Sequence, residues 1–258
     1  MIDTAELFSL KGRSALITGG SRGIGRMIAE GFLRAGARVY ISARKADACV
    51  ATADELSAIG PCVSLPADVS AQGGVQQLVA AYQQHEESLD ILVNNAGAAW
   101  GAPYEEFPES GWDKVVDLNL KAPFFLTQAL TPLLKKAATD HLAKVIHIAS
   151  IDGVSVNPQE TYSYAASKAG LIHLTRRMAL KLAPERIVVS AIAPGAFAST
   201  MNKDARDHGD EIAKRIPLGR IGTPEDMAGA AIFLASRAGD YVVGSTLIVD
   251  GGVTYARS

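Results

Sequence analysis

The 258-residue sequence has few cysteines, no excess of one charge and no arrangement typical of a metal site. Its two cysteines, Cys49 and Cys62, cannot build a disulfide framework, and their spacing matches no zinc motif. The five histidines include no pair one helical turn apart and have no cysteine at zinc-ligand spacing. We therefore expect no metal.

Basic clusters and long apolar runs are also missing. The sequence has 25 lysines and arginines against 27 aspartates and glutamates. Nucleic acid, whose phosphates are bound by clustered cations, is therefore not expected as a partner. No apolar run is long enough to span a bilayer, and the N-terminus, with Asp3 and Glu6, lacks the basic segment and apolar stretch of a signal peptide. We expect a cytoplasmic protein with no membrane partner.

Short apolar runs alternate with segments whose apolar residues recur at helical spacing. Runs such as Ile91-Leu92-Val93 are apolar on both faces, as a parallel sheet covered by helices on each side requires. We predict one α/β domain over residues 1–258, a doubly wound Rossmann fold with a mainly parallel seven-stranded sheet. The expected strands are 14–18, 38–42, 62–65, 90–94, 144–149, 187–192 and 247–249, and the expected helices are about 23–36, 46–58, 74–85, 119–136 and 164–182.

The segment 197–222 differs from the rest because it is polar and directly follows a predicted strand end. It carries Asp204, Arg206, Asp207 and Asp210. Loops beyond strand ends often close over a substrate. We therefore predict a mobile helical flap over the substrate in this segment.

A glycine-rich loop, Thr18-Gly19-Gly20-Ser21-Arg22-Gly23-Ile24-Gly25, lies between the first predicted strand and helix. Gly19 would allow the tight turn, Gly23 would let the backbone approach a pyrophosphate, and Gly25 would let the helix pack closely on the strand. Because a helix N-terminus presents N–H groups to phosphate, the pattern predicts a dinucleotide site. A purely structural turn is the alternative for this motif taken alone.

No carboxylate ends the second predicted strand, where NAD-binding folds place an acid that holds the ribose hydroxyls. The stretch reads Ile41-Ser42-Ala43-Arg44. Arg44, helped by Arg22 and Ser42, could neutralise a 2′-phosphate. The pattern favours NADP(H) as the cofactor, and the alternative is that both arginines are solvated surface charges.

Two later strand ends carry polar residues that suit a cofactor or a turn. Asp68 follows the third predicted strand and is placed to bind an adenine amino group, and Asn94-Asn95-Ala96-Gly97 ends the fourth. Aspartate, asparagine and glycine also form ordinary turns. Their order along the chain favours a functional role.

The string Tyr164-Ala165-Ala166-Ser167-Lys168 places a phenol and an ammonium one helical turn apart. A phenol ordinarily titrates near pH 10, and a nearby ammonium is expected to lower the pKa of Tyr164. Tyr164 could then be an acid in carbonyl reduction and a base in alcohol oxidation. Ser150 could orient a carbonyl and stabilise its oxyanion. A surface pair and a helix cap are the alternatives.

In combination these motifs resemble the short-chain dehydrogenase/reductase family over nearly the whole chain. The glycine loop, Asn94 to Gly97, Asn119, Ser150, Tyr164 with Lys168, and Pro194-Gly195 stand in the family's order. The resemblance implies a catalytic tetrad of Asn119, Ser150, Tyr164 and Lys168. Asn119 would hold a water that feeds protons through Lys168, which would also hold the nicotinamide ribose. The implied cofactor site comprises Gly19, Ser21, Arg22, Gly23, Ile24, Gly25, Arg44, Asp68, Val69, Asn95, Ala96, Gly97, Tyr164, Lys168, Pro194, Gly195, Phe197 and Ser199.

Within that family the segments Trp100-Gly101-Ala102 and Ile216-Pro217-Leu218-Gly219-Arg220 resemble bacterial 3-oxoacyl reductases. The resemblance implies NADPH-dependent reduction of a 3-oxoacyl thioester, small or carrier-linked, with Tyr164 as the general acid. A reductase or dehydrogenase of a sugar, polyol or other secondary alcohol is the alternative, because the tetrad is shared. The predicted helix 164–182 carries a second apolar stripe, and the family pairs this helix with a symmetry mate, so a homodimer or homotetramer is expected.

Overall fold

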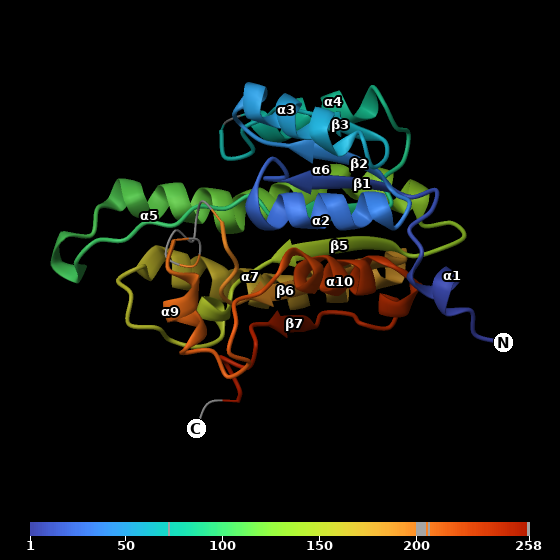
Figure 1. The fold of residues 1–258 in the computed structure, drawn as a ribbon. Coiled ribbons are helices and arrows are strands. Elements are labelled where there is room, and N and C mark those ends of the chain that lie inside the picture. Colours follow the sequence, from blue (N-terminus) through green and yellow to red (C-terminus); the bar gives the residue numbers. More distant parts are fainter. Residues whose placement is uncertain (72, 200–204, 206, 257–258) are drawn as a thin grey trace.

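A seven-stranded parallel sheet forms the centre of the protein, for which a computed structural model describes residues 1–71, 73–199, 205 and 207–256 (Figure 1). The strand order is β3-β2-β1-β4-β5-β6-β7, and all the neighbouring strands run parallel. The predicted doubly wound parallel sheet is confirmed. The strands are β1 (Ser14–Thr18), β2 (Arg38–Ser42), β3 (Cys62–Ser64), β4 (Ile91–Asn94), β5 (Ala143–Ile148), β6 (Ile187–Pro194) and β7 (Thr246–Val249).

Helices cover both faces of this sheet. The α-helices are α1 (Thr4–Phe8), α2 (Gly23–Arg34), α3 (Ala46–Leu56), α4 (Gly74–Gln83), α5 (Glu109–Val116), α6 (Ala122–Ala137), α7 (Tyr162–Leu182), α9 (Gly209–Ala213) and α10 (Pro224–Ala235). Shorter helical turns are η1 (Tyr104–Glu106), η2 (Asp117–Lys121), η3 (Ile151–Gly153), η4 (Ala183–Glu185) and η5 (Arg237–Gly239). In Figure 1, α2 and α10 lie on the near face, and α6 and α7 lie on the far face.

The core divides into two main apolar clusters, one on each face. Residues of α2, α3 and α10 form one cluster, and residues of α4, α6 and α7 form the other. In α2, Ile28 and Phe32 are fully buried one turn apart, as the helical spacing predicts. Gly31 lets α10 approach closely, because a Cβ there would lie 2.6 Å from the Cβ of Ala228. The central strands β1, β4, β5 and β6 are buried on both faces, which explains their apolar sequences.

The predicted helix 119–136 begins ten residues earlier than expected, at Glu109. Three helical elements, α5, η2 and α6, follow one another without a break. The middle one, η2, is a π-helical turn, in which the backbone bonds span one extra residue. Gly111 in α5 packs on the ring of Trp100, since a Cβ there would lie 2.8 Å from it. The apolar spacing does not predict α5, because this helix is mostly polar and contains Gly111.

The predicted flap lies partly outside the described residues, because 200–204 and 206 are not among them. Asp204 and Arg206 therefore lie outside, whereas Asp207 and Asp210 are described. Before the gap, Phe197 is buried and pairs as an isolated bridge with Gly222, where a Cβ would lie 2.3 Å from the ring of Phe197. This bridge joins the two ends of the segment. The movement of the flap stays a prediction.

Neither a membrane-spanning helix nor a metal-binding cluster is found among the described residues. No helix among them combines the length and the apolar character needed to cross a bilayer. The same residues contain no group of three or more histidine, cysteine or acidic side chains that could hold a metal ion.

Candidate active site

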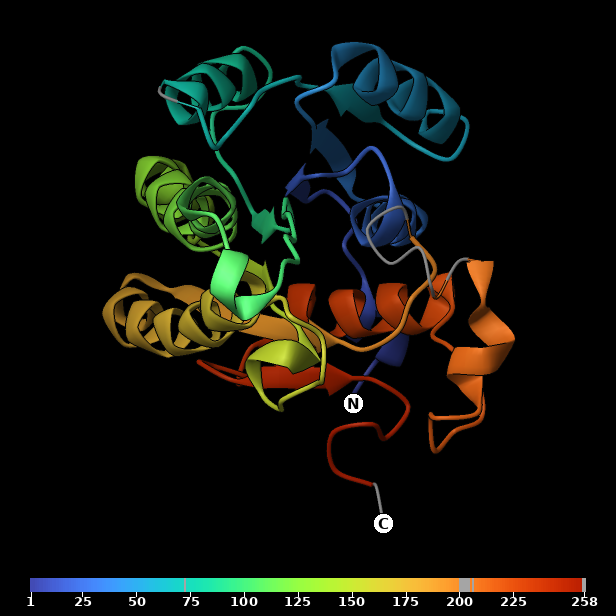
Figure 2. The ribbon, with the colours of Figure 1, turned by 90° about the vertical axis from the view of Figure 1, so that its left-hand side faces the viewer.

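The candidate site lies at the edge where the parallel strands end, which Figure 2 views end-on. Here the glycine loop turns from β1 into α2. Gly19 and Gly23 have φ angles of +66° and +53°, a region that L side chains rarely adopt. A Cβ at Gly25 would lie 2.3 Å from the carbonyl oxygen of Gly19. The loop is thus a tight turn that closes on the first turn of α2, as the glycine spacing predicts.

Asn95 holds this loop to the end of β4. Its Nδ2 donates to the carbonyl oxygens of Thr18 and Gly19 at 2.9 and 3.1 Å. The Thr18 hydroxyl accepts hydrogen bonds from the backbone N–H groups of Asn95 and Ala96, both at 3.0 Å. The side-chain amide of Asn95 therefore shapes the loop, and Thr18 is a supporting residue that the motif reading missed. The predicted cofactor contacts of Asn95 and Ala96 stay predictions.

The residues expected to choose the cofactor lie at the same edge. Arg22 directly precedes α2, without a capping hydrogen bond from its side chain, and Arg44 lies just after β2. Both are exposed, and neither forms an ion pair with a residue that the structure describes. Asp68 has one oxygen engaged, since its Oδ1 accepts from the N–H of Ser70 at 3.1 Å and from its hydroxyl at 2.6 Å. Asp68 thus forms the ordinary turn that is the alternative to adenine binding, and its role towards adenine stays a prediction. The next residue, Val69, is buried.

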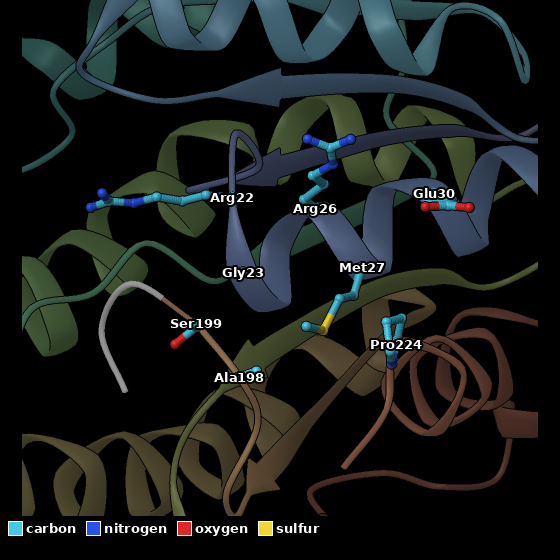
Figure 3. A pocket seen from close by; sticks show the side chains of 8 residues that line it. All are labelled: Arg22, Gly23, Arg26, Met27, Glu30, Ala198, Ser199 and Pro224. Atoms are coloured by element: carbon cyan, nitrogen blue, oxygen red, sulfur yellow. The ribbon is translucent and has the colours of Figure 1, made fainter. Parts of the chain in front are cut away.

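A cavity of about 300 Å³ lies beside α2, next to the glycine loop. Figure 3 shows the residues that line it. Of the predicted site residues it brings together Arg22, Gly23 and Ser199, and a Cβ at Gly23 would lie 3.1 Å from the Cβ of Ser199. Motif reasoning missed the other lining residues, which are Arg26, Met27, Glu30, Ala198 and Pro224.

At the end of β6, the predicted residues Pro194 and Gly195 run beside β7. The N–H of Gly195 donates to the carbonyl of Val249 at 2.9 Å, and a Cβ at Gly195 would lie 2.7 Å from the Cβ of Asp250. Gly195 is thus required for close packing of these two strand ends. Phe197, two residues on, points into the core, so only its backbone is placed for a cofactor contact.

Asn119 lies in the π-helical turn η2, and its side chain is 1% exposed. Its Oδ1 accepts from the N–H of Ala98 at 2.8 Å, while its Nδ2 donates to the Ala98 carbonyl at 2.9 Å and to the Ser167 hydroxyl at 3.1 Å. These bonds join the loop after β4 to α7. π-helical turns are frequent at functional sites, but no feature of the sequence predicts this one.

Lys168 is nearly fully buried beside Tyr164. Its Nζ donates to the carbonyl of Ile148 at 2.6 Å and lies 5.6 Å from the centroid of the Tyr164 ring. A Cβ at Gly97 would lie 3.3 Å from the Oδ1 of Asn119 and 3.8 Å from the Nζ of Lys168. Gly97, Asn119 and Lys168 thus come together in space, although 71 residues separate the first from the last in the chain.

Ser150 and Tyr164 complete the cluster. Ser150 is buried at the end of β5, where its hydroxyl accepts from the N–H of Asp152 at 3.1 Å. Ser150 also lies close to Tyr164, and its hydroxyl acts to lower the pKa of that phenol. The alternative of a helix cap is confirmed for Ser150, since its side chain caps η3. Its role towards a substrate carbonyl stays a prediction.

The predicted lowering of the Tyr164 pKa is wrong in this structure. Burial raises the pKa of Tyr164 to about 12, with the nearby Asp152 carboxylate adding to the shift and the hydrogen bond from Ser150 opposing it. Lys168 does not offset this shift because its ammonium points at the Ile148 carbonyl, and burial lowers the pKa of Lys168 to about 8. The phenol is accordingly protonated at neutral pH.

Comparison with known proteins identifies relatives over almost the full length. A family model described as enoyl-(acyl carrier protein) reductase matches residues 19–254. The chain is 48% identical to the rhamnolipids biosynthesis 3-oxoacyl-(acyl-carrier-protein) reductase of Pseudomonas aeruginosa, covering 95% of this chain and 97% of that protein. It is 37% identical to the gluconate 5-dehydrogenase of Gluconobacter oxydans, covering 96% and 97%.

A solved structure agrees with these relatives. The Pseudomonas aeruginosa RhlG/NADP active-site complex matches with a TM-score of 0.93 at 47% identity, covering 96% of this chain and 99% of that one. The family model, the sequence relatives and the fold all indicate the same family. This chain is a member of the short-chain dehydrogenase/reductase family and hence an oxidoreductase.

Proposed function

We propose that this protein reduces a 3-oxoacyl thioester to the 3-hydroxyacyl thioester with NADPH. The observation that carries the proposal is the cluster at the strand ends, where the half-buried and protonated phenol of Tyr164 lies beside the buried side chains of Ser150 and Lys168. A protonated phenol is the form that reduction of a carbonyl requires. The Pseudomonas aeruginosa relative, a 3-oxoacyl reductase by name, supports the thioester as substrate.

The residues present fit a dinucleotide cofactor. The glycine loop keeps clear the space that a Cβ at Gly19 or Gly25 would fill, and it exposes the N-terminus of α2 to a pyrophosphate. Arg44 and Arg22, both exposed and without an ion pair to the described part of the chain, suit the 2′-phosphate, and the Oδ2 of Asp68 suits the adenine. NADP in the matching Pseudomonas aeruginosa structure supports the same choice. When bound, the reduced nicotinamide supplies the hydride.

The side chains of the cluster divide the remaining work among them. Ser150 holds the substrate carbonyl oxygen by a hydrogen bond, and Tyr164 delivers its proton to that oxygen. The phenolate left behind is unfavourable in this place, so the ammonium of Lys168, 5.6 Å from the centroid of the Tyr164 ring, must turn from the Ile148 carbonyl towards the phenolate as the proton leaves. Asn119 and Lys168 both lie next to Gly97. Asn119 holds a water from which a proton returns to Tyr164 by way of Lys168.

The 2′-phosphate gives the first prediction. Arg44→Ala is expected to weaken NADPH binding by about 10- to 100-fold, because a charged hydrogen bond contributes about 1.5 to 3 kcal/mol, while NADH binding stays unchanged. Fluorescence titration of both nucleotides measures this. The control is Arg34→Ala, an exposed arginine of α2 that pairs with Glu30 at 2.7 Å. Equal losses for NADPH and NADH in Arg44→Ala would contradict a phosphate contact.

The substrate is tested by the rate of NADPH oxidation with a short 3-oxoacyl thioester, measured beside NADH. A second candidate, oxidation of a sugar acid or polyol with NADP⁺, is favoured by the identity to the gluconate 5-dehydrogenase of Gluconobacter oxydans. Gluconate with NADP⁺ is therefore run in parallel. Turnover of the thioester alone supports the first proposal, and turnover of gluconate alone replaces it with the second.

Assembly and location complete the proposal. We propose one domain over residues 1–258, a cytoplasmic location and a homodimer or homotetramer. Large apolar side chains remain exposed on α6 and α7, including Phe124, Phe125 and Leu180, and these suit pairing of the helices with a second copy. Sedimentation that shows only a monomer at working concentration would contradict the assembly.

A further inference from the structure

Two matched hydrogen-bond chains join the central strands to the helices behind them. On β4, Asn94 donates from Nδ2 to the Thr127 hydroxyl of α6 at 3.1 Å. On β5, the Nδ1 of His147 lies 2.9 Å from the Thr175 hydroxyl of α7. Asn94 and His147 are register partners in the sheet. Each threonine hydroxyl also donates, at 2.7 Å, to the carbonyl four residues earlier in its helix, which is that of Pro123 or Leu171.

The hydrogen bonds of Thr175 determine the tautomer of His147. The Thr175 hydroxyl has one hydrogen, which it gives to the Leu171 carbonyl, so its oxygen must accept from the Nδ1–H of His147. His147 is therefore neutral with its proton on Nδ1. Its Nε2 has no hydrogen-bond partner among the described residues. Burial lowers the pKa of His147 to about 3, and the charge of Lys168 adds to this shift. The imidazole thus stays in one form across the physiological range.

This pair lies directly beside the reactive cluster. The residue after His147 is Ile148, whose carbonyl accepts the hydrogen bond from Lys168, and Ser150 follows two residues later. Thr175 lies seven residues, or about two turns, beyond Lys168 on α7 and so shares its face. His147 and Thr175 are 0% exposed, and Lys168 is 4% exposed. Strand β5 and helix α7 are thus joined twice, once by Lys168 and once by the pair.

We propose that His147 and Thr175 are positioning residues that fix the position of helix α7 relative to strand β5. Their bond holds the helix where the Lys168 ammonium reaches the Ile148 carbonyl and the Tyr164 phenol reaches Ser150. Asn94 and Thr127 make the same connection for α6, whose preceding turn carries Asn119. The inference rests on the proposed roles of Tyr164 and Lys168. Neither member of the pair touches the reacting atoms, so both act through the residues they position.

The test compares variants that break the bond with variants that keep it. His147→Leu and Thr175→Val are expected to lower kcat at least tenfold with little change in KM, because a shift of about 1 Å at reacting groups can cost up to about 100-fold. His147→Asn and Thr175→Ser keep a donor and an acceptor, as Asn94 and Thr127 do, and should recover most of kcat. Thr175→Val also leaves the buried Nδ1–H without an acceptor, so His147→Leu is the variant that should fold more readily.

Thr131→Val is the matched control. The Thr131 hydroxyl donates to the Thr127 carbonyl at 2.8 Å, so it makes the same backbone bond within α6 but has no strand partner among the described residues. This variant should leave kcat unchanged. A fall in melting temperature with unchanged kcat in His147→Leu and Thr175→Val would show a merely structural bond and overturn the proposal.

A second measurement needs no substrate. NMR titration of the Lys168 side chain is expected to show its pKa, which burial lowers to about 8, rising towards the ordinary lysine value in His147→Leu and Thr175→Val. Thr131→Val and His147→Asn should leave it in place. The proposal is overturned if the Lys168 pKa is the same in all variants. Because this readout does not involve a thioester, an error in the proposed substrate would not disturb it.

Discussion

Replacing Tyr164 by phenylalanine is expected to lower kcat for carbonyl reduction by about a thousandfold, within the range that loss of a general acid produces. The change removes one oxygen and leaves the ring beside Lys168 in place. No other phenol of the cluster can supply the proton. The affinity for NADPH should change by less than about threefold, because the glycine loop and Arg44 are untouched. Single-turnover kinetics and a binding titration on the same protein measure the two quantities separately.

Tyr162→Phe is the matched control for this change. Tyr162 begins the same helix, but its exposed hydroxyl donates to Glu160 at 3.2 Å and its ring packs against Tyr104 and Phe107. Loss of that hydroxyl should leave kcat unchanged. Equal kcat in Tyr164→Phe and in the unchanged protein would remove Tyr164 from the reaction. A large loss of NADPH affinity in Tyr164→Phe would give it a binding role instead.

The order of strands and helices, and the residues at the strand ends, follow from local patterns. Runs such as 91–93 are apolar on both faces because the central strands are covered on both sides. The glycine spacing from Gly19 to Gly25 predicts a tight loop because only glycine tolerates the φ angles and contacts found there. The motifs predict that Ser150, Tyr164 and Lys168 share a site, and the structure brings them together.

Features that depend on the surroundings of a side chain could not be read in this way. The spacing of Tyr164 and Lys168 suggests a lowered phenol pKa, but burial acts the other way and Lys168 is directed at a backbone carbonyl. The π-helical turn around Asn119 has no periodic signature. The contact between His147 and Thr175 has no local signature either, because the two residues lie 28 positions apart and only the fold brings them together.

Adding one carbon at Gly25 is expected to weaken NADPH binding at least about 100-fold. In Gly25→Ala the new Cβ would lie 2.3 Å from the Gly19 carbonyl oxygen and 2.4 Å from the Nδ2 of Asn95. Atoms cannot approach so closely, so either the loop or the start of α2 must move, and overpacking of this kind typically costs about 1 to 3 kcal/mol. The loop N–H groups would then no longer converge on a pyrophosphate. A fluorescence titration with NADPH measures the loss.

Gly229→Ala separates this effect from a general response to alanine in a helix. Gly229 lies in α10, which packs on α2, but nothing is within 4 Å of the position where its Cβ would be. Alanine there should leave NADPH binding unchanged and raise stability by about 0.5 to 1 kcal/mol, because glycine loses more backbone freedom on folding. Gly25→Ala should both bind poorly and melt lower. Normal NADPH affinity in Gly25→Ala would show that the loop does not hold the cofactor, whatever its effect on stability.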